Sequence, residues 1–140
     1  MIDKKTGSIT LSATRRLSAG DAFDEVSGLP LGEVQTVADL GNGWKWLTIK
    51  NVAVEGKYFI LSLGFHTNVL KLIELMVAND RFDLTPNWAD WSEANELAIL
   101  TDLRIWVANE LGREGAFEWG DIEATYDSKS GSSSITIRYH

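Results

Sequence analysis

The middle of the chain contains the feature that most restricts its fold, a Gly-Asn-Gly triplet at residues 41–43 with strand-like sequence on both sides. Gly and Asn tolerate the positive φ angles that tight hairpin turns require. Residues 33–40 and 44–54 are therefore predicted to form two antiparallel strands. A Glu-Gly pair at residues 55–56 then separates a third strand, predicted over residues 57–65. This order predicts an antiparallel meander.

The third and fourth strands of the meander are indicated by different patterns. In the third, apolar residues such as Phe59 and Ile60 occupy both faces, which indicates a central strand covered on both sides. Residues 69–77 have an apolar spacing that also fits a helix. A strand is favoured, because a short turn at residues 66–68 precedes them and few good helix formers are present.

A long helix is predicted over residues 90–111. Asp90 or Ser92 can cap its first turn, Glu93 suits the positive end of its dipole, and Gly112 ends it. The side chains predicted to form its core stripe are Leu97, Leu100, Leu103, Val107 and Leu111. The side chains predicted to lie opposite are Asn95, Asp102 and Asn109.

The C-terminal segment is predicted to form a hairpin with its turn at residues 127–131. In its return strand, Ile135 and Ile137 alternate inward with polar neighbours. In its first strand, Trp119 and Ile122 lie in opposite phases of the alternation, although both are apolar. A β-bulge at residues 120–121 would bring both side chains to the core, because one extra residue shifts the phase.

The N-terminal segment is predicted to contain a hairpin over residues 2–12 and a short helix. The Ser18–Asp21 spacing resembles a capping box that opens this helix, which runs through about Val26. We expect the segment to cover part of the sheet face that the long helix leaves open. The prediction is one α+β domain over residues 1–140: an antiparallel sheet of six to eight strands, built from a meander and hairpins, with one long helix packed on one face.

Residue types that common catalytic and metal sites need are scarce. The chain has no Cys, and its only two His residues are His66 and His140. The chain therefore lacks the residues that thiolate sites, His-rich zinc sites and Ser–His pairs require. Glu93 and Glu96 have the spacing of carboxylate-bridged metal sites, which also need histidines on other helices. We predict no catalytic residue, no metal site and no cofactor; two carboxylates that converge in space are the open alternative.

The net charge of −7 is unevenly distributed. Residues 1–70 contain seven Lys/Arg and seven Asp/Glu, whereas residues 71–140 contain six and thirteen. Because phosphate groups are bound by cations, this balance disfavours nucleic acids and anionic membranes as partners and favours a basic protein. A charge that only maintains solubility is the alternative. The polar N-terminus and the absence of a ~20-residue apolar run predict a cytoplasmic protein without a membrane segment.

Six Trp residues are a high number for 140 residues. Trp44, Trp46 and Trp119 fall in predicted strands and are expected in the core. Trp106 lies at the edge of the core stripe of the helix, where a partly exposed aromatic side chain can anchor a protein interface; core packing is the alternative. The candidate partner-binding residues are the predicted outward positions Asp90, Asn95, Asp102, Trp106, Asn109, Glu118 and Glu123.

Short segments near the C-terminus carry a resemblance to a known group of proteins. They are Trp-Ala-Asp-Trp-Ser-Glu at 88–93 with Glu96, Phe-Glu-Trp-Gly at 117–120, Tyr-Asp-Ser-Lys-Ser-Gly at 126–131 and Ile-Thr-Ile-Arg-Tyr at 135–139. Over about its last 55 residues, the chain resembles small bacterial immunity proteins of polymorphic-toxin and contact-dependent antagonism systems. The resemblance implies a cytoplasmic protein that performs no chemistry and blocks its toxin by surface complementarity. Many such toxins are basic nucleases, which an acidic surface binds fast and tightly.

Two further functions stay open at this point. One is a small-ligand-binding domain or minor enzyme that uses a pocket between the helix and the sheet, which converging carboxylates in an apolar pocket would favour. The other is a homo-oligomeric structural protein, for example a homodimer, that pairs through the sheet face left uncovered by the helix.

Overall fold

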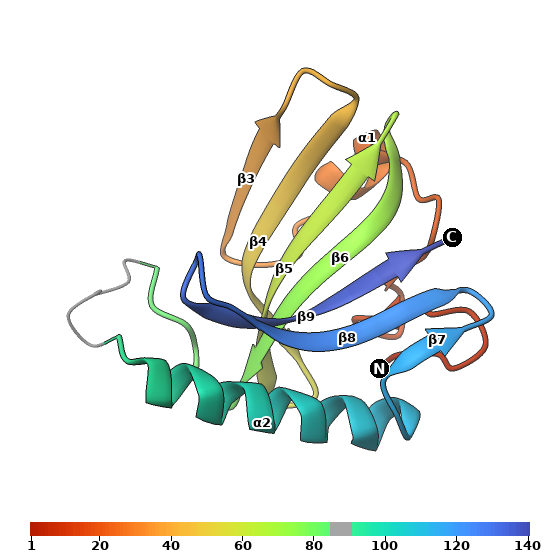
Figure 1. Cartoon of the computed structure of the whole chain (residues 1–140). Coiled ribbons are helices and arrows are strands. Elements are labelled where there is room, and N and C mark those ends of the chain that lie inside the picture. Colours follow the sequence, from red (N-terminus) through yellow and green to blue (C-terminus); the bar gives the residue numbers. More distant parts are fainter. Residues whose placement is uncertain (85–90) are drawn as a thin grey trace.

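The computed structural model describes residues 1–84 and 91–140, and its architecture is α+β (Figure 1). Its strands and helices are β1 (Ile9–Thr10), β2 (Arg16–Leu17), α1 (Phe23–Ser27), β3 (Val34–Asp39), β4 (Trp44–Val54), β5 (Lys57–His66), β6 (Val69–Ala78), α2 (Glu93–Leu111), β7 (Gly115–Phe117), β8 (Gly120–Asp127) and β9 (Ser132–Tyr139). Strands β3 to β9 form one antiparallel sheet in the order β3-β4-β5-β6-β9-β8-β7, and β1 pairs with β2. The predicted fold class is confirmed.

The predicted meander is present as β3-β4-β5-β6. Gly41 and Gly43 have φ angles of 73° and 91°, as the turn between β3 and β4 requires. The ambiguous segment is the strand β6, not a helix. It pairs with β5 on one side and with β9 on the other, so its backbone hydrogen bonds are satisfied within the sheet.

One face of the sheet holds the core. In β5, Phe59, Leu61, Leu63 and Phe65 are all buried on this face. At one end, the Phe23 ring of α1 packs edge-on against Phe65, with 5.2 Å between ring centroids. At the other end, the Trp106 ring of α2 packs against Phe59 at 5.8 Å. Both helices therefore lie on the same side of the sheet.

The N-terminal segment also lies on this core face, so the expectation that it covers the opposite face is wrong. The Tyr139 hydroxyl, in phase with the buried side chains of β9, donates a hydrogen bond to the Gly7 carbonyl oxygen at 2.6 Å. The amino group of Met1 contacts a Glu110 carboxylate oxygen of α2 at 3.1 Å. Residues 2–12 form a shorter hairpin than predicted: Ile2 bridges Ile9, the Asp3 amide donates to the Ser8 carbonyl oxygen at 2.9 Å, and the Thr10 amide donates to the Met1 carbonyl oxygen at 2.8 Å.

The short helix also differs from its prediction. Helix α1 begins at Phe23 after Ala22, whose side chain makes no capping hydrogen bond. The Ser18–Asp21 pair forms a turn before the helix, in which the Ser18 amide donates to an Asp21 carboxylate oxygen at 2.8 Å. The capping-box spacing thus identified a local hydrogen bond but misplaced the helix start.

The opposite face of the sheet is half exposed. Trp44 and Trp46 of β4 and Tyr58 and Ile60 of β5 lie on this face, and all four are partly accessible to solvent. The predictions that these Trp residues belong to the core and that β5 is covered on both sides are therefore wrong. The Trp44 and Trp46 rings instead stack on each other with centroids 6.4 Å apart.

Helix α2 begins at Glu93, after Ser92, one of the two predicted caps, and it ends at Leu111 as predicted. The Ser92 side chain accepts a hydrogen bond from the Asn95 amide at 3.1 Å, and Gly112 ends the helix with a φ of 83°. The Glu96 side chain accepts a hydrogen bond from the Ser133 amide of β9 at 3.0 Å, which fastens the first turns of the helix to the sheet. Within the described residues, no helix is both long enough and apolar enough to cross a membrane.

The phase change between Trp119 and Ile122 has a different cause from the predicted bulge. Strands β7 and β8 pair with each other, Phe117 opposite Gly120, so Glu118 and Trp119 form a two-residue hairpin turn. The chain reverses where a single strand was expected. Gly120 is required there because a Cβ atom would lie 1.8 Å from the Arg138 carbonyl oxygen of β9.

Candidate protein-binding surface

Helix α2 has apolar side chains on both of its sides. Its buried residues are Leu100, Leu103, Trp106, Val107 and Leu111. Contrary to the predicted stripe, Leu97 is 45% exposed, and Ile105 is 54% exposed. We define the outer face of α2 as the exposed residues Ala94, Leu97, Ala98, Thr101, Ile105 and Ala108, which share one side of the helix. A surface helix ordinarily carries polar and charged side chains on its solvent side, so this face, apolar at its centre with Asp102 and Asn109 beside it, is typical of a surface that another molecule covers.

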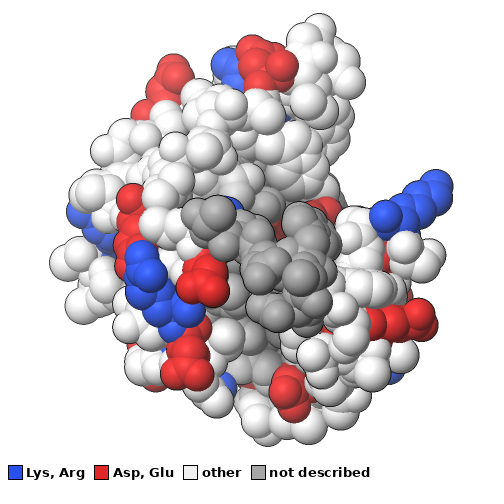
Figure 2. Space-filling view, turned by 90° about the vertical axis from the view of Figure 1, so that its left-hand side faces the viewer, with Lys and Arg blue, Asp and Glu red and all other residues white. Residues whose placement is uncertain are grey.

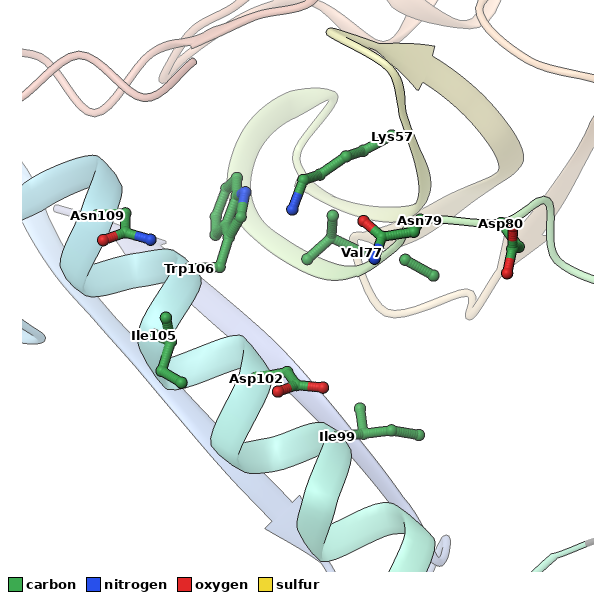
Figure 3. Close-up of a pocket in the computed structure, with 10 residues that line it drawn as sticks. Lys57, Val77, Asn79, Asp80, Ile99, Asp102, Ile105, Trp106 and Asn109 are labelled. Atoms are coloured by element: carbon green, nitrogen blue, oxygen red, sulfur yellow. The ribbon is translucent and has the colours of Figure 1, made fainter.

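A groove runs beside this face, between α2 and the ends of β5 and β6 (Figure 3). Its volume is about 460 Å³. Asp102 and Trp106 form part of the helical wall, and Lys57, Val77 and Asn79 form part of the opposite wall. The groove therefore joins an exposed apolar helix face to polar groups of the sheet.

The apolar part of the groove is held in place by the core. Trp106 is only 9% exposed, because its ring packs on Phe59, so the prediction of a partly exposed anchor is wrong. Val77 and Ile99, which are half buried, flank it in the groove. A partner would reach the Trp106 ring only by inserting a side chain between the helix and the strands.

Polar side chains surround the apolar part. Among the described residues, none of the side chains of Lys57, Asn79, Asp80, Asp102 and Asn109 makes a hydrogen bond or an ion pair. Their donors and acceptors are available to a bound molecule. Two carboxylates and one ammonium group give this rim a net negative charge, which suits an Arg or Lys side chain of a partner.

The segment that carries Asn79 and Asp80 is fixed by a buried Asn. Asn51 adopts a φ of 59° at the irregular pairing of β4 and is buried. Its side chain accepts a hydrogen bond from the Phe82 amide at 2.8 Å and donates one to the Phe82 carbonyl oxygen at 2.9 Å. The exposed Arg81 guanidinium pairs with Glu33 and lowers the pKa of that carboxyl group. This wall of the groove is thus tied to β4 and to the start of β3.

The candidate residues identified in the sequence fall in several places. Asp102, Trp106 and Asn109 come together in the groove, and Asn95 lies exposed on α2 two turns before Asp102. Glu118 lies in the turn between β7 and β8, and Glu123 lies on β8; both are exposed and away from the groove. Asp90 lies outside the described residues.

The sequence analysis missed residues on both sides of the groove. Lys57, Val77 and Asp80 are brought to α2 only by the fold, because they lie 19 or more positions before the helical wall in the sequence. Ile105 could have been found, since it is a large apolar residue of α2 outside the predicted core stripe.

The acidic half of the chain does not present one uninterrupted negative surface. Glu114 approaches Arg104 at 3.9 Å, and Asp121 pairs with Arg138 at 3.0 Å. Glu110 is engaged by the chain amino group. Figure 2 shows acidic and basic side chains together on one side of the molecule, with uncharged residues between them. Local neutralisation therefore reduces the field expected from the −7 charge.

No group of three or more His, Asp or Glu side chains that could hold a metal ion occurs in the described residues. Comparison of the chain with family models, with curated proteins and with solved structures found no match.

Proposed function

We propose that this protein is a non-enzymatic protein-binding module whose partner covers the outer face of α2 and inserts a side chain into the adjacent groove. The observation that carries the proposal is the exposure of Leu97 and Ile105, 45% and 54%, on the outer face of α2. Protein interfaces place such apolar residues at their centre and polar groups at their rim. Asp102 and Asn109 occupy the rim position here.

Within this class, we propose the role of a bacterial immunity protein that binds and blocks a cognate toxin in the cytoplasm. The resemblance in the last part of the sequence supports this role, and so does a surface that can bind without chemistry. Asp102, one turn before Trp106 on α2, offers a basic side chain an ion pair beside the Trp106 ring, which can add a cation–π contact. A basic toxin is therefore the partner class that the groove favours.

The experiment uses the product of the open reading frame next to the gene, purified as a catalytically inactive variant. Its binding to the full chain is measured by titration calorimetry for the wild type, Ile105→Lys and Asp102→Asn. Ala13→Lys, which adds the same charge at an exposed site in the β1–β2 loop, is the matched control. We expect Ile105→Lys to weaken binding at least about 30-fold, because a charge would enter the interface centre. We expect Asp102→Asn to weaken it about tenfold and Ala13→Lys to leave it unchanged.

Two outcomes would contradict the proposal. One is equal affinity for the wild type and Ile105→Lys, which would place the partner elsewhere. The other is a neighbouring product that does not bind and whose toxicity is undiminished when the two proteins are produced together. Circular dichroism of each variant shows that a lost affinity is not a lost fold.

A small-ligand-binding domain is the second candidate, because the groove does lie between the helix and the sheet. Lys57 and Asp102 could hold a small polar molecule on opposite walls. Ile105 and Asp102 are exposed, however, so such a ligand would stay largely open to water, unlike most small-molecule sites. A compound that raised the melting temperature of the wild type but not of Lys57→Met would favour this candidate.

A further inference from the structure

Strand β3 is an edge of the sheet that lacks the usual protection against pairing. Its six residues, Val-Gln-Thr-Val-Ala-Asp, include no Lys, Arg or Pro, and they pair with β4 in a regular register without a bulge. Five of the six are exposed. Natural proteins block such edges with charges, prolines, bulges or very short strands, because an open row of backbone groups recruits another strand.

The other edge of the same sheet is protected. Strand β7 has three residues, and the Arg113 side chain donates a hydrogen bond to the Ala116 carbonyl oxygen at 2.6 Å. The same guanidinium group lies 4.1 Å from the centre of the Phe117 ring. This chain therefore closes one edge and leaves the other open, which indicates that β3 has a partner.

The backbone geometry shows which groups of β3 are free to pair. The Leu40 amide donates to the Trp44 carbonyl oxygen at 3.0 Å, so Leu40 faces β4. Because backbone groups alternate sides along a strand, those of Gln35, Val37 and Asp39 point to the open edge. Among the described residues, none of these three has a backbone partner at that edge.

We propose that β3 pairs antiparallel with β3 of a second copy, about a two-fold axis through Val37, so that the chain forms a homodimer with one continuous sheet. In this register Val37 faces Val37 of the second copy, and Gln35 faces Asp39 of the second copy. This register joins the open backbone groups of Gln35, Val37 and Asp39, and it places Thr36 opposite Ala38 of the second copy. No like charges face each other.

The exposed apolar side chains of β3, together with Leu40 directly after it, are arranged symmetrically about the same axis. Val34, Val37 and Leu40 are 36%, 55% and 56% exposed, and they are spaced three residues apart with Val37 at the centre. The register therefore also brings Val34 opposite Leu40 of the second copy, twice per dimer. This two-fold self-complementarity favours a second copy over an unrelated extended peptide, which would have no reason to match it.

The dimer does not rest on the proposed toxin-binding role. Figure 1 shows β3 and α2 in different parts of the molecule, so pairing through β3 leaves the outer face of α2 uncovered. Two strands of six residues give a small interface, and we expect a dissociation constant in the micromolar range. The two proposals can therefore fail separately.

The test is the mass of the full chain in sedimentation equilibrium, at concentrations from about 5 μM to 1 mM. We expect the wild type to approach the mass of two chains, and Val37→Lys to remain monomeric because two charges would meet on the axis. Ala13→Lys, at an exposed site in the β1–β2 loop, should dimerise like the wild type. A wild type that stays monomeric at 1 mM, or a Val37→Lys variant that still dimerises, would overturn the proposal.

A charge-swap pair tests the register itself. Val34→Lys alone and Leu40→Glu alone should each weaken association about tenfold, because each places a charge against an apolar side chain at two points of the interface. The double variant should restore much of the loss, because opposite charges then face each other across the axis. No restoration would refute this register. Slower hydrogen exchange of the Val37 amide at high protein concentration is the expected direct sign of pairing.

Discussion

Strands β3 and β7 are the two edges of one sheet, and they differ in length, in covering and in sequence. Strand β7 spans three residues, and its turn packs on the N-terminal segment, where the Trp119 indole donates to the Lys4 carbonyl oxygen at 3.0 Å. The Trp119 ring also lies 5.9 Å from Tyr139. Strand β3 is twice as long, and its apolar side chains are exposed.

The two edges of the sheet therefore differ in how far contacts within the chain cover them. At the β7 edge, the N-terminal segment, the tight turn and Arg113 all use contacts within the chain. At the β3 edge, the backbone groups of Gln35, Val37 and Asp39 have no partner among the described residues. The following changes would break or sharpen this contrast, from the largest expected effect to the smallest.

Glycine-to-alanine substitutions at one turn beside each edge should have very different costs. At Gly120, the added Cβ atom would overlap the Arg138 carbonyl oxygen, and we expect a loss of at least about 3 kcal/mol in unfolding free energy. At Gly41, no heavy atom lies within 4 Å of the added Cβ atom, and only the positive φ opposes it, at about 1 kcal/mol. Urea denaturation of the two variants measures both values. Equal losses would show that the β7 edge is no more tightly packed than the β3 edge.

Tyr139→Phe should weaken the contact between β9 and the N-terminal segment. The variant leaves the Gly7 carbonyl oxygen without the donor that it has at 2.6 Å, and we expect a loss of about 1–2 kcal/mol. Urea denaturation is again the measurement. A loss below about 0.3 kcal/mol would mean that water replaces the hydroxyl group and that this region is less closed than the structure indicates.

The stability of the wild type should also fall in alkali through the same side chain. Burial raises the pKa of Tyr139 far above its ordinary value of 10.0. The unfolded chain then loses this proton first, so the contribution is complete below pH 10 and is lost as pH rises above it. We expect a decline of about 1 kcal/mol by pH 11 that is absent from Tyr139→Phe. Parallel declines in the two proteins would assign the effect to other groups.

Arg113→Ala should have the smallest effect on stability. The side chain is exposed, and it contributes hydrogen bonds to two carbonyl groups and a contact with the Phe117 ring. We expect a loss of about 0.5–1 kcal/mol in urea denaturation. The mass in solution should match that of the wild type, because three residues are too few to add a stable strand. A larger oligomer would show that Arg113, and not the length of β7, protects this edge.

The sequence by itself determined the features that depend on near neighbours. The Gly-Asn-Gly turn, the Ser92 cap and the Gly112 terminus all act within a few residues, through φ preferences and local hydrogen bonds, and the structure has each of them. Turns and residue types identified the strands of the meander for the same reason. Within the candidate site, this reasoning could place Asp102 and Asn109 outside the core stripe of α2, and the structure shows both exposed at the groove.

The tertiary structure alone decided which face each element covers. Leu97, expected in the core, is exposed, and Trp106, considered as a partly exposed anchor, is buried. Burial on α2 depends on where the curved sheet and Phe59 lie, not on the type of residue. Lys57 and Asp80 joined the groove only through pairing between strands distant in sequence. A β-bulge and a hairpin turn at Trp119 shift the alternation of apolar residues equally, so the sequence pattern does not distinguish them. The pairing of β7 with β8 shows that the chain forms the turn. Local energies fix turns and caps; contacts between distant residues select the faces.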